Sequence, residues 1–229
     1  MDIQTDEVLP IVLAARGISK SFGDVPVLFS IDFDVRAGEI HALMGENGAG
    51  KSTLVKILAG FETRTDGEIL FDGKPVTLQP DGTAEALGIA LIHQEMNLAE
   101  HLTVAESLFL GREPTRFGFL DRKSMRAETR KVLAELGTEL SPDALIADLA
   151  IADRQLVEIA KAISRHARVV FMDEPTAVLS QEETDRLFVQ VRKLRAQGTS
   201  FVFVSHKLDE VMELTDRVTI LRDGQWVKT

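Results

Sequence analysis

The sequence contains no cysteine and no surplus of basic residues. The lack of cysteine excludes a disulfide framework and a thiolate metal site, and it suits a reducing compartment. The net charge of -10 and the pI near 5.0 argue against a nucleic-acid-binding surface, whose usual sign is a basic patch. We therefore expect no nucleic acid among the partners of this chain.

The chain also lacks a long apolar run. No stretch is long enough to cross a bilayer as a helix, and residues 1–7 are acidic where a secretory leader would be basic. We therefore expect any membrane association to depend on a partner protein. With 229 residues, 45% of them hydrophobic, the chain is long enough for one large domain with a substantial core.

The segment from Gly45 to Ser52 is the most informative one present. It fits the pattern G-x-x-x-x-G-K-[ST], follows a strand-like apolar run at residues 40–44, and precedes helical apolar spacing. Such a loop cradles phosphates with backbone N–H groups, while its lysine reaches the terminal phosphates and its hydroxyl binds magnesium. The alternative is a glycine-rich turn beside a solvated lysine. The loop residues expected to bind nucleotide are Gly45, Glu46, Asn47, Gly48, Ala49, Gly50, Lys51, Ser52 and Thr53.

Polar side chains follow three further apolar, strand-like runs. Gln94 comes after residues 89–92, the pair Asp173 and Glu174 ends the run from residue 169, and His206 follows residues 200–204. In an open α/β sheet such strand ends meet where ligands bind. We expect Gln94 to sense the metal or the terminal phosphate, and Asp173 to hold magnesium.

Glu174 and His206 are the residues expected to act on water. Glu174, one position after the magnesium carboxylate, points elsewhere and is placed to polarise the attacking water as a general base. His206 at the end of a core strand is placed to contact the terminal phosphate or the water beside it. The alternative for the acidic pair is a solvated strand end, which the phosphate loop makes the weaker interpretation.

The spacing of apolar residues predicts an α/β fold with a helical insertion. Strand patterns occupy the early part of the chain, and Asp72-Gly73 is a strong hairpin signal. Between residues 97 and 149 the strand pattern disappears, and a capping box at Thr103 and an amphipathic stretch from Arg122 to Leu136 predict helices. We therefore expect one domain over residues 1–229, with a helical subdomain inserted at about 96–150.

The order of these motifs resembles the nucleotide-binding domain of ABC transporters from about residue 12 to the end. The resemblance implies the ABC ATPase fold, a P-loop core with an antiparallel β subdomain, and an Mg-ATP cofactor. It also implies that Gln94 is the Q-loop residue, Asp173 and Glu174 the Walker B pair, residues 177–180 the D-loop, and His206 the switch histidine. Phe22, for which core packing and base stacking are both open, would then stack on adenine, with Val27 beside the nucleotide.

Two short runs resemble a narrower group, the duplicated ATPase subunits of bacterial monosaccharide importers. They are residues 93–98 and 157–162. By this resemblance the chain is the amino-terminal half of such a subunit, on the cytoplasmic side of the cell membrane. The implied partners are an integral-membrane permease, a second nucleotide-binding domain and, indirectly, a periplasmic solute-binding protein. The permease would contact the segment after Gln94, roughly residues 96–111.

The sequence departs from the family pattern at two places. The signature Leu-Ser-Gly-Gly-Gln is replaced by residues 149–153, which keep only Leu149, and the D-loop ends in Ser180 instead of aspartate. Ala150 has no hydroxyl, and Ile151 places a branched side chain where the backbone must approach a phosphate closely. The altered signature therefore affects the surface that this chain would present to the nucleotide of a partner domain. It does not affect the residues that bind this chain's own nucleotide.

Two other classes of function compete with a transporter ATPase. A soluble ABC-family ATPase that acts on DNA or ribosomes would need a long coiled coil between Gln94 and Leu149, or a basic surface, and the sequence offers neither. A small-molecule phosphotransferase would need an acceptor pocket, for which no residues stand out. The sequence therefore favours the transporter ATPase, and it does not identify the solute.

Overall fold

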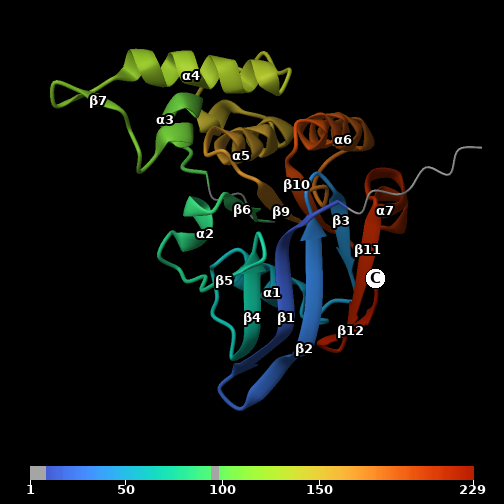
Figure 1. Cartoon of the computed structure of the whole chain (residues 1–229). Coiled ribbons are helices and arrows are strands. Elements are labelled where there is room, and N and C mark those ends of the chain that lie inside the picture. The colour runs from blue at the N-terminus through green and yellow to red at the C-terminus, as the bar shows by residue number, and fades with distance from the viewer. Residues whose placement is uncertain (1–8, 94–97) are drawn as a thin grey trace, which may run out of the picture.

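The computed structural model describes residues 9–93 and 98–229. These residues form two main sheets with helices between and beside them (Figure 1). None of the helices in these two ranges is long and apolar enough to cross a membrane.

The first sheet is antiparallel, with strand order β2-β1-β4-β5. Its strands are β1 (Ile11–Phe22), β2 (Val25–Arg36), β4 (Asp66–Phe71) and β5 (Lys74–Val76). In β2 the apolar residues Ile31, Phe33 and Val35 are buried and alternate with more exposed positions, as the sequence predicts. Asp72 and Gly73 have φ values of 49° and 73° and join β4 to β5 in a two-residue hairpin, which is also as predicted.

The second sheet has the strand order β12-β11-β3-β10-β9-β6 and is parallel except for its edge strand β12. Its strands are β3 (Ile40–Met44), β6 (Ile89–Ile92), β9 (Val169–Asp173), β10 (Ser200–Val204), β11 (Arg217–Arg222) and β12 (Gln225–Lys228). The inner strands are almost entirely buried, which suits a parallel sheet covered on both faces. Their carboxyl ends therefore meet at one edge.

The helices divide the core into two layers. Helix α1 (Lys51–Leu58) lies between the two sheets and contributes Leu54, Ile57 and Leu58 to their shared core (Figure 1). Helices α5 (Ile151–Ser164) and α6 (Gln181–Ala196) cover the other face of the parallel sheet, where the rings of Phe188 and Phe203 pack edge-on with centroids 5.9 Å apart. The short helices α2 (Thr83–Ala86) and α7 (Leu208–Leu214) flank the sheet.

The segment expected to form a helical subdomain contains α3 (Val104–Phe109), α4 (Arg122–Glu135) and a 3-10 turn, η1 (Ile146–Asp148). The capping box at Thr103 is confirmed: its hydroxyl accepts from the Glu106 N–H at 3.2 Å, and the Glu106 carboxylate accepts from the Thr103 N–H at 3.0 Å. The segment also holds a short hairpin that the sequence does not predict, in which β7 (Thr115–Arg116) pairs with β8 (Phe119–Leu120). Strands of two residues are too short to give a period that sequence reading can detect.

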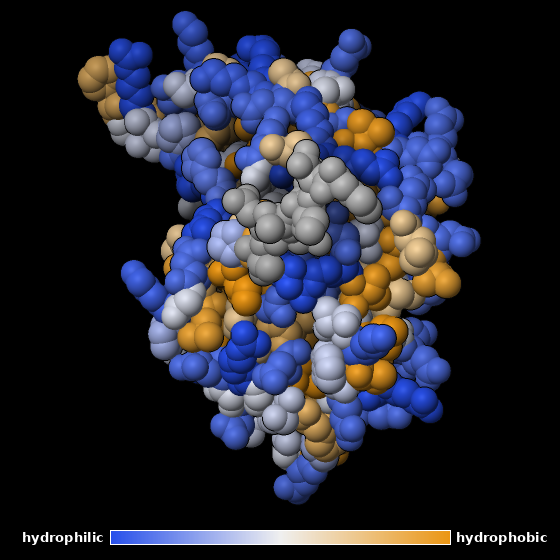
Figure 2. Space-filling model, turned by 45° about the vertical axis from the view of Figure 1, so that its right-hand side comes forward, coloured by the Kyte–Doolittle hydropathy of each residue, from blue (hydrophilic) through white to orange (hydrophobic). Residues whose placement is uncertain are grey.

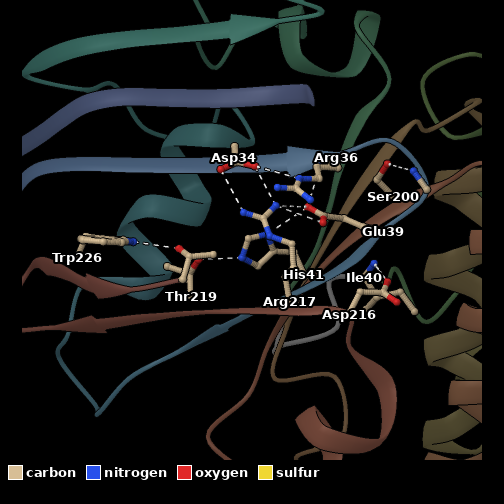
Figure 3. Close-up of polar contacts among 12 residues, drawn as sticks. Asp34, Arg36, Glu39, Ile40, His41, Ser200, Asp216, Arg217, Thr219 and Trp226 are labelled. Atoms are coloured by element: carbon tan, nitrogen blue, oxygen red, sulfur yellow. Dashed lines mark hydrogen bonds and ion pairs between the residues drawn. The ribbon is translucent and has the colours of Figure 1, made fainter. Parts of the chain in front are cut away.

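A buried polar network joins β2, β3 and β11 (Figure 3). The His41 ring is fully buried, with Nδ1 3.2 Å from a Glu39 oxygen and Nε2 2.8 Å from the Thr219 hydroxyl. Arg217 donates to Asp34 at 2.9 Å and also contacts Glu39. Burial opposes the ionisation of Asp34, but the hydrogen bonds and charge of Arg217 outweigh it, so the pKa of Asp34 is lowered. The network fixes β3, the strand that leads into the phosphate loop.

Candidate functional site

The phosphate loop connects β3 to α1 in the strand-loop-helix order that the motif requires. Gly50, the residue before the helix, has φ 94°, and a Cβ added to it would lie 2.5 Å from Leu28 Cδ2. A Cβ on Gly45 would lie 2.3 Å from the Leu221 carbonyl oxygen. Both positions therefore need glycine for close packing as well as for the turn.

Lys51 is buried, with 6% of its surface exposed. Its ammonium donates to the carbonyl oxygens of Gly45 at 2.8 Å and Glu46 at 3.0 Å. The side chain thus folds back over its own loop, and the alternative of a solvated lysine is wrong. A cation held here by two weak acceptors can exchange them for phosphate oxygens without moving far.

Asp173, at the end of β9, lies beside the phosphate loop, with its carboxylate near the Ser52 side chain. Burial raises the pKa of Asp173, the neighbouring Glu174 carboxylate adds to the rise, and the nearby Ser52 hydroxyl opposes it. Among the described residues, no group of three or more His, Cys, Asp or Glu side chains is placed to hold a metal ion by itself. One carboxylate with one hydroxyl suits Mg²⁺, which completes its shell with water and substrate phosphates. The donor set therefore fits magnesium.

Glu174 points away from that pair and toward the end of β10. Its Oε1 lies 3.2 Å from Nδ1 of His206, which follows β10 and is exposed. Its backbone N–H donates to the Val204 carbonyl at 3.0 Å, and its φ of 47° is unusual for a residue with a long side chain. Backbone strain of this kind gathers at functional sites. The two adjacent carboxylates thus face different partners, as the sequence predicts.

Glu210 on α7 is a residue that the sequence reading missed. Its carboxylate accepts from the Thr176 hydroxyl at 2.7 Å and the Ser205 hydroxyl at 3.1 Å, and from the Lys207 ammonium at 2.9 Å. These bonds join the segment after Glu174 to the loop that carries His206. The only signal in the sequence is the i, i+3 spacing of Lys207 and Glu210, which is too common to single out a site.

The candidates for base recognition lie on the antiparallel sheet. Phe22 ends β1 with 48% of its surface exposed, and the Lys20 ammonium lies 4.6 Å from its ring centroid. Phe22 is therefore not a core residue, and its ring keeps surface free for stacking. The Val27 carbonyl oxygen lies 3.4 Å from the position of a Cβ built on Gly50, so Val27 borders the phosphate loop.

Gln94 lies outside the described residues, and its expected role stays a prediction. The residue before it, His93, packs its ring against Phe61 with centroids 5.1 Å apart. Both of these rings line a cavity of about 440 Å³ between β6, the region of α2 and the end of α5.

The altered signature lies at the start of α5. Ala150 is the N-cap residue and provides no side-chain hydrogen bond to the first turn, while Ile151 is exposed. Arg154 holds the preceding loop by donating to the carbonyls of Leu149 at 3.1 Å and Ala147 at 2.9 Å. The helix start is therefore open to solvent, but it lacks the hydroxyl that a serine would provide.

Comparison with known proteins places this site in a family. The family model described as "ABC transporter" matches residues 28–177. The chain is 54% identical over 213 residues to "Ribose import ATP-binding protein RbsA" of Chromobacterium violaceum, covering 93% of this chain and 42% of the relative. It is 48% identical to "Putative ribose/galactose/methyl galactoside import ATP-binding protein 1" of Agrobacterium fabrum, with 96% and 43% covered. The chain thus spans less than half the length of these relatives.

Solved structures of ATP-binding cassettes have the same fold as this chain. A nucleotide-free ATP-binding cassette from an ABC transporter aligns with a TM-score of 0.85 at 25% identity, over 95% of this chain and 90% of that chain. The ADP conformation of another ATP-binding cassette of an ABC transporter aligns with a TM-score of 0.82 at 26% identity, over 95% and 89%. The predicted fold class is confirmed.

Proposed function

The chain belongs to the ABC transporter family, and from that premise we propose that it is the ATP-binding and hydrolysing domain of a bacterial monosaccharide importer. The observation that carries the proposal is the meeting at one edge of the parallel sheet of the buried Lys51, the neighbours Asp173 and Ser52, and the pair Glu174 and His206. The relatives named for ribose and galactose import support the sugar class.

The residues divide the work of ATP hydrolysis. The N–H groups of the phosphate loop and the Lys51 ammonium bind the phosphates, with Phe22 and Val27 at the base. Ser52 and Asp173 would hold Mg²⁺, which offsets charge on the transferring phosphoryl group when bound, and Gln94 is proposed as its third contact. The Lys51 ammonium gives up the carbonyls of Gly45 and Glu46 as phosphate oxygens replace them.

Glu174 and His206 would handle the attacking water. A water that attacks the terminal phosphorus loses its proton to the Glu174 carboxylate, and the bond to the leaving ADP oxygen breaks. His206, whose Nδ1 lies 3.2 Å from that carboxylate, would orient it and leave the other ring nitrogen available to the terminal phosphate. Glu210 supports this arrangement through Ser205 and Thr176.

We propose the same single domain, residues 1–229, with the helical subdomain at about 96–150, as one half of a paired ATPase. The second nucleotide-binding domain, the permease and an external solute-binding protein are the proposed partners, at the cytoplasmic face of the cell membrane. The match covers 42% and 43% of the length of the two import relatives, which supports pairing with a second domain.

The cavity lined by His93 is a candidate docking site for the permease. It is lined by apolar residues of β6 together with Phe61, and by the charged residues Glu158, Lys161 and Arg165 of the α5 region, so it suits an amphipathic helix end. One of its lining residues, His93, directly precedes Gln94 in the chain, and the predicted contact segment, residues 96–111, follows Gln94 in the chain. We propose that both border one docking groove.

Reconstitution of this chain with its permease and second domain in proteoliposomes tests the function. We expect ATP-dependent uptake of ribose or galactose, no uptake of an amino acid, and loss of uptake on Glu174→Gln. Cysteines introduced singly at Phe61 and Leu110 should both crosslink to the permease. Each would be the sole reactive thiol of its variant, because the parent chain has no cysteine. Uptake that persists in Glu174→Gln, or crosslinking only from a cysteine at Val189 on α6, would contradict the proposal.

A further inference from the structure

The β7–β8 hairpin carries an exposed apolar tip that plays no part in the nucleotide site. Phe117 is 89% exposed, Phe119 79% and Leu120 52%. A single exposed apolar residue needs no explanation, but three within four positions on a projecting turn are typical of an interaction surface. Figure 1 shows the hairpin extending away from the body of the molecule, beside α4.

The backbone of the tip is held in an unusual conformation. Phe117 has φ 53° and Gly118 has φ 83°, so the turn places a bulky aromatic residue in the left-handed region. The Arg116 guanidinium lies 5.4 Å from the Phe117 ring centroid. The fold thus presents an aromatic ring to solvent with a cation next to it.

The surroundings of the tip are basic within an acidic protein. Residues 112–131 contain seven arginines and lysines against three acidic residues, although the whole chain has a net charge of -10. On α4, Arg122, Arg126 and Arg130 follow one another at i, i+4 spacing and share a flank of the helix.

Only some of these cations are neutralised. Arg122 pairs with Glu106 at 3.4 Å, and Arg126 pairs with Asp143 at 2.5 Å. Arg116, Lys123 and Arg130 make no ion pair among the described residues. Figure 2 shows an apolar projection at the upper left of the molecule, bordered by hydrophilic side chains.

We propose that the β7–β8 hairpin and the first turns of α4, together called the basic tip (residues 115–130), dock on an anionic lipid bilayer. Phenylalanine and leucine side chains enter the boundary between headgroups and acyl chains, while arginine and lysine stay among anionic headgroups. The basic tip combines these apolar and basic side chains within one continuous stretch of the chain. The acidic remainder of the chain is repelled by such a membrane, so the tip also sets the orientation.

A lipid fits the basic tip better than a folded protein does. A stable protein interface covers about 800 Å² per partner, which a hairpin of two two-residue strands cannot supply alone. A bilayer requires no matching groove, and a few inserted rings with nearby cations suffice for reversible binding. The cavity proposed for the permease is lined by the α2 region, which lies on the same side of Figure 1 as the hairpin. This shared side supports membrane docking only if the proposed transporter function holds. The argument from the composition of the basic tip does not depend on that function.

The test is flotation of the whole chain with vesicles, without any permease. We expect binding to vesicles of phosphatidylglycerol mixed with phosphatidylcholine, little binding to phosphatidylcholine alone, and release at high salt. The double variant Phe117→Ser with Phe119→Ser should bind about tenfold or more weakly. Arg116→Gln with Lys123→Gln should lose about fivefold per charge removed. The matched control is Val189→Ser, an exposed apolar residue on α6, which should bind as the parent does.

A second readout locates the contact. An environment-sensitive dye on Phe119→Cys should shift to the blue on anionic vesicles, and the same dye on Val189→Cys should not. Unchanged ATP binding shows that each variant is folded. The proposal is overturned if neither vesicle type binds the chain, if the Phe117 and Phe119 variant floats like the parent, or if the dye on residue 119 responds only when a permease is present. The last outcome would make the basic tip a protein contact.

Discussion

The Nδ1 atom of His206 lies 3.2 Å from Oε1 of Glu174, although 32 residues separate them in the chain. The contact exists because β9 and β10 are parallel neighbours with Asp173 opposite Val204, so the residues that follow each strand meet at one edge. Asp173, one residue earlier, lies instead near Ser52. The two adjacent carboxylates thus have different neighbours, and this separation supports the first prediction, in which Glu174 alone acts on water.

Glu174→Gln should keep ATP affinity and lose turnover in the full assembly by about 10²–10⁴-fold, because the amide cannot accept the proton of the attacking water. Steady-state phosphate release measures the turnover, and nucleotide titration measures the affinity. Glu182→Gln is the matched control, since that acid is exposed on α6 and pairs only with Arg186. Parent-level turnover in the Glu174 variant would mean that another group is the base.

Lys51→Ala should weaken Mg-ATP binding by about tenfold to a hundredfold, since a hydrogen bond to a charged group contributes about 1.5–3 kcal/mol. Titration with a fluorescent nucleotide analogue measures the loss. Lys56→Ala, on the same helix but exposed, should bind nucleotide as the parent does. Equal losses in both variants would assign the effect to the helix as a whole.

Asp173→Asn should stabilise the nucleotide-free chain at neutral pH and remove the magnesium dependence of nucleotide binding. The pKa of Asp173 is raised in the folded chain, so folding favours its protonated form. The contribution of Asp173 to the free energy of unfolding therefore decreases as pH rises from the ordinary carboxyl pKa through the raised one, and this cost persists at neutral pH. An amide avoids it.

Thermal melts at several pH values, with and without Mg²⁺, measure this effect. The melting temperature of the Asn variant should exceed that of the parent by a few degrees near neutral pH, and the gap should close as the pH falls below the ordinary carboxyl range. Asp209→Asn, at an exposed position on α7, is the control. An Asn variant that melts at or below the parent's temperature near neutral pH would contradict a raised pKa of Asp173; the parent's own profile also includes carboxylates of lowered pKa, such as Asp34.

The sequence predicts most of this site because its parts have local patterns. The phosphate loop has fixed spacing, and Asp173, Glu174 and His206 each end an apolar run that can only be a buried strand. What it does not predict depends on tertiary contacts. Glu210 accepts from the Thr176 hydroxyl, 34 positions away in the chain. His41 looks like any strand residue, and the β7–β8 hairpin is too short to show a period.

The altered signature supports the last prediction, which concerns pairing. If this chain pairs with itself, each ATP faces Ala150 and Ile151 in place of a serine hydroxyl and an open glycine backbone. One lost hydrogen bond to a charged phosphate costs about 1.5–3 kcal/mol, so ATP-driven closure should weaken by about tenfold to a hundredfold. The dipole of α5 offsets only part of this. We therefore expect the chain alone to bind Mg-ATP, to remain mainly monomeric and to hydrolyse slowly, whereas a partner domain with an intact signature should activate the site at Lys51 and Glu174.

Ala150→Ser tests the cause directly. A serine at this N-cap should add about 1 kcal/mol of stability, because it accepts from the first turn of α5, which now has no side-chain cap. It should also make ATPase activity rise more steeply with protein concentration, since it returns the hydroxyl to the neighbouring phosphate. Thermal melts report the cap alone, and the concentration dependence reports the pairing. A steep rise in the parent chain, or a Ser variant that changes only its melting temperature, would show that the missing hydroxyl does not limit closure.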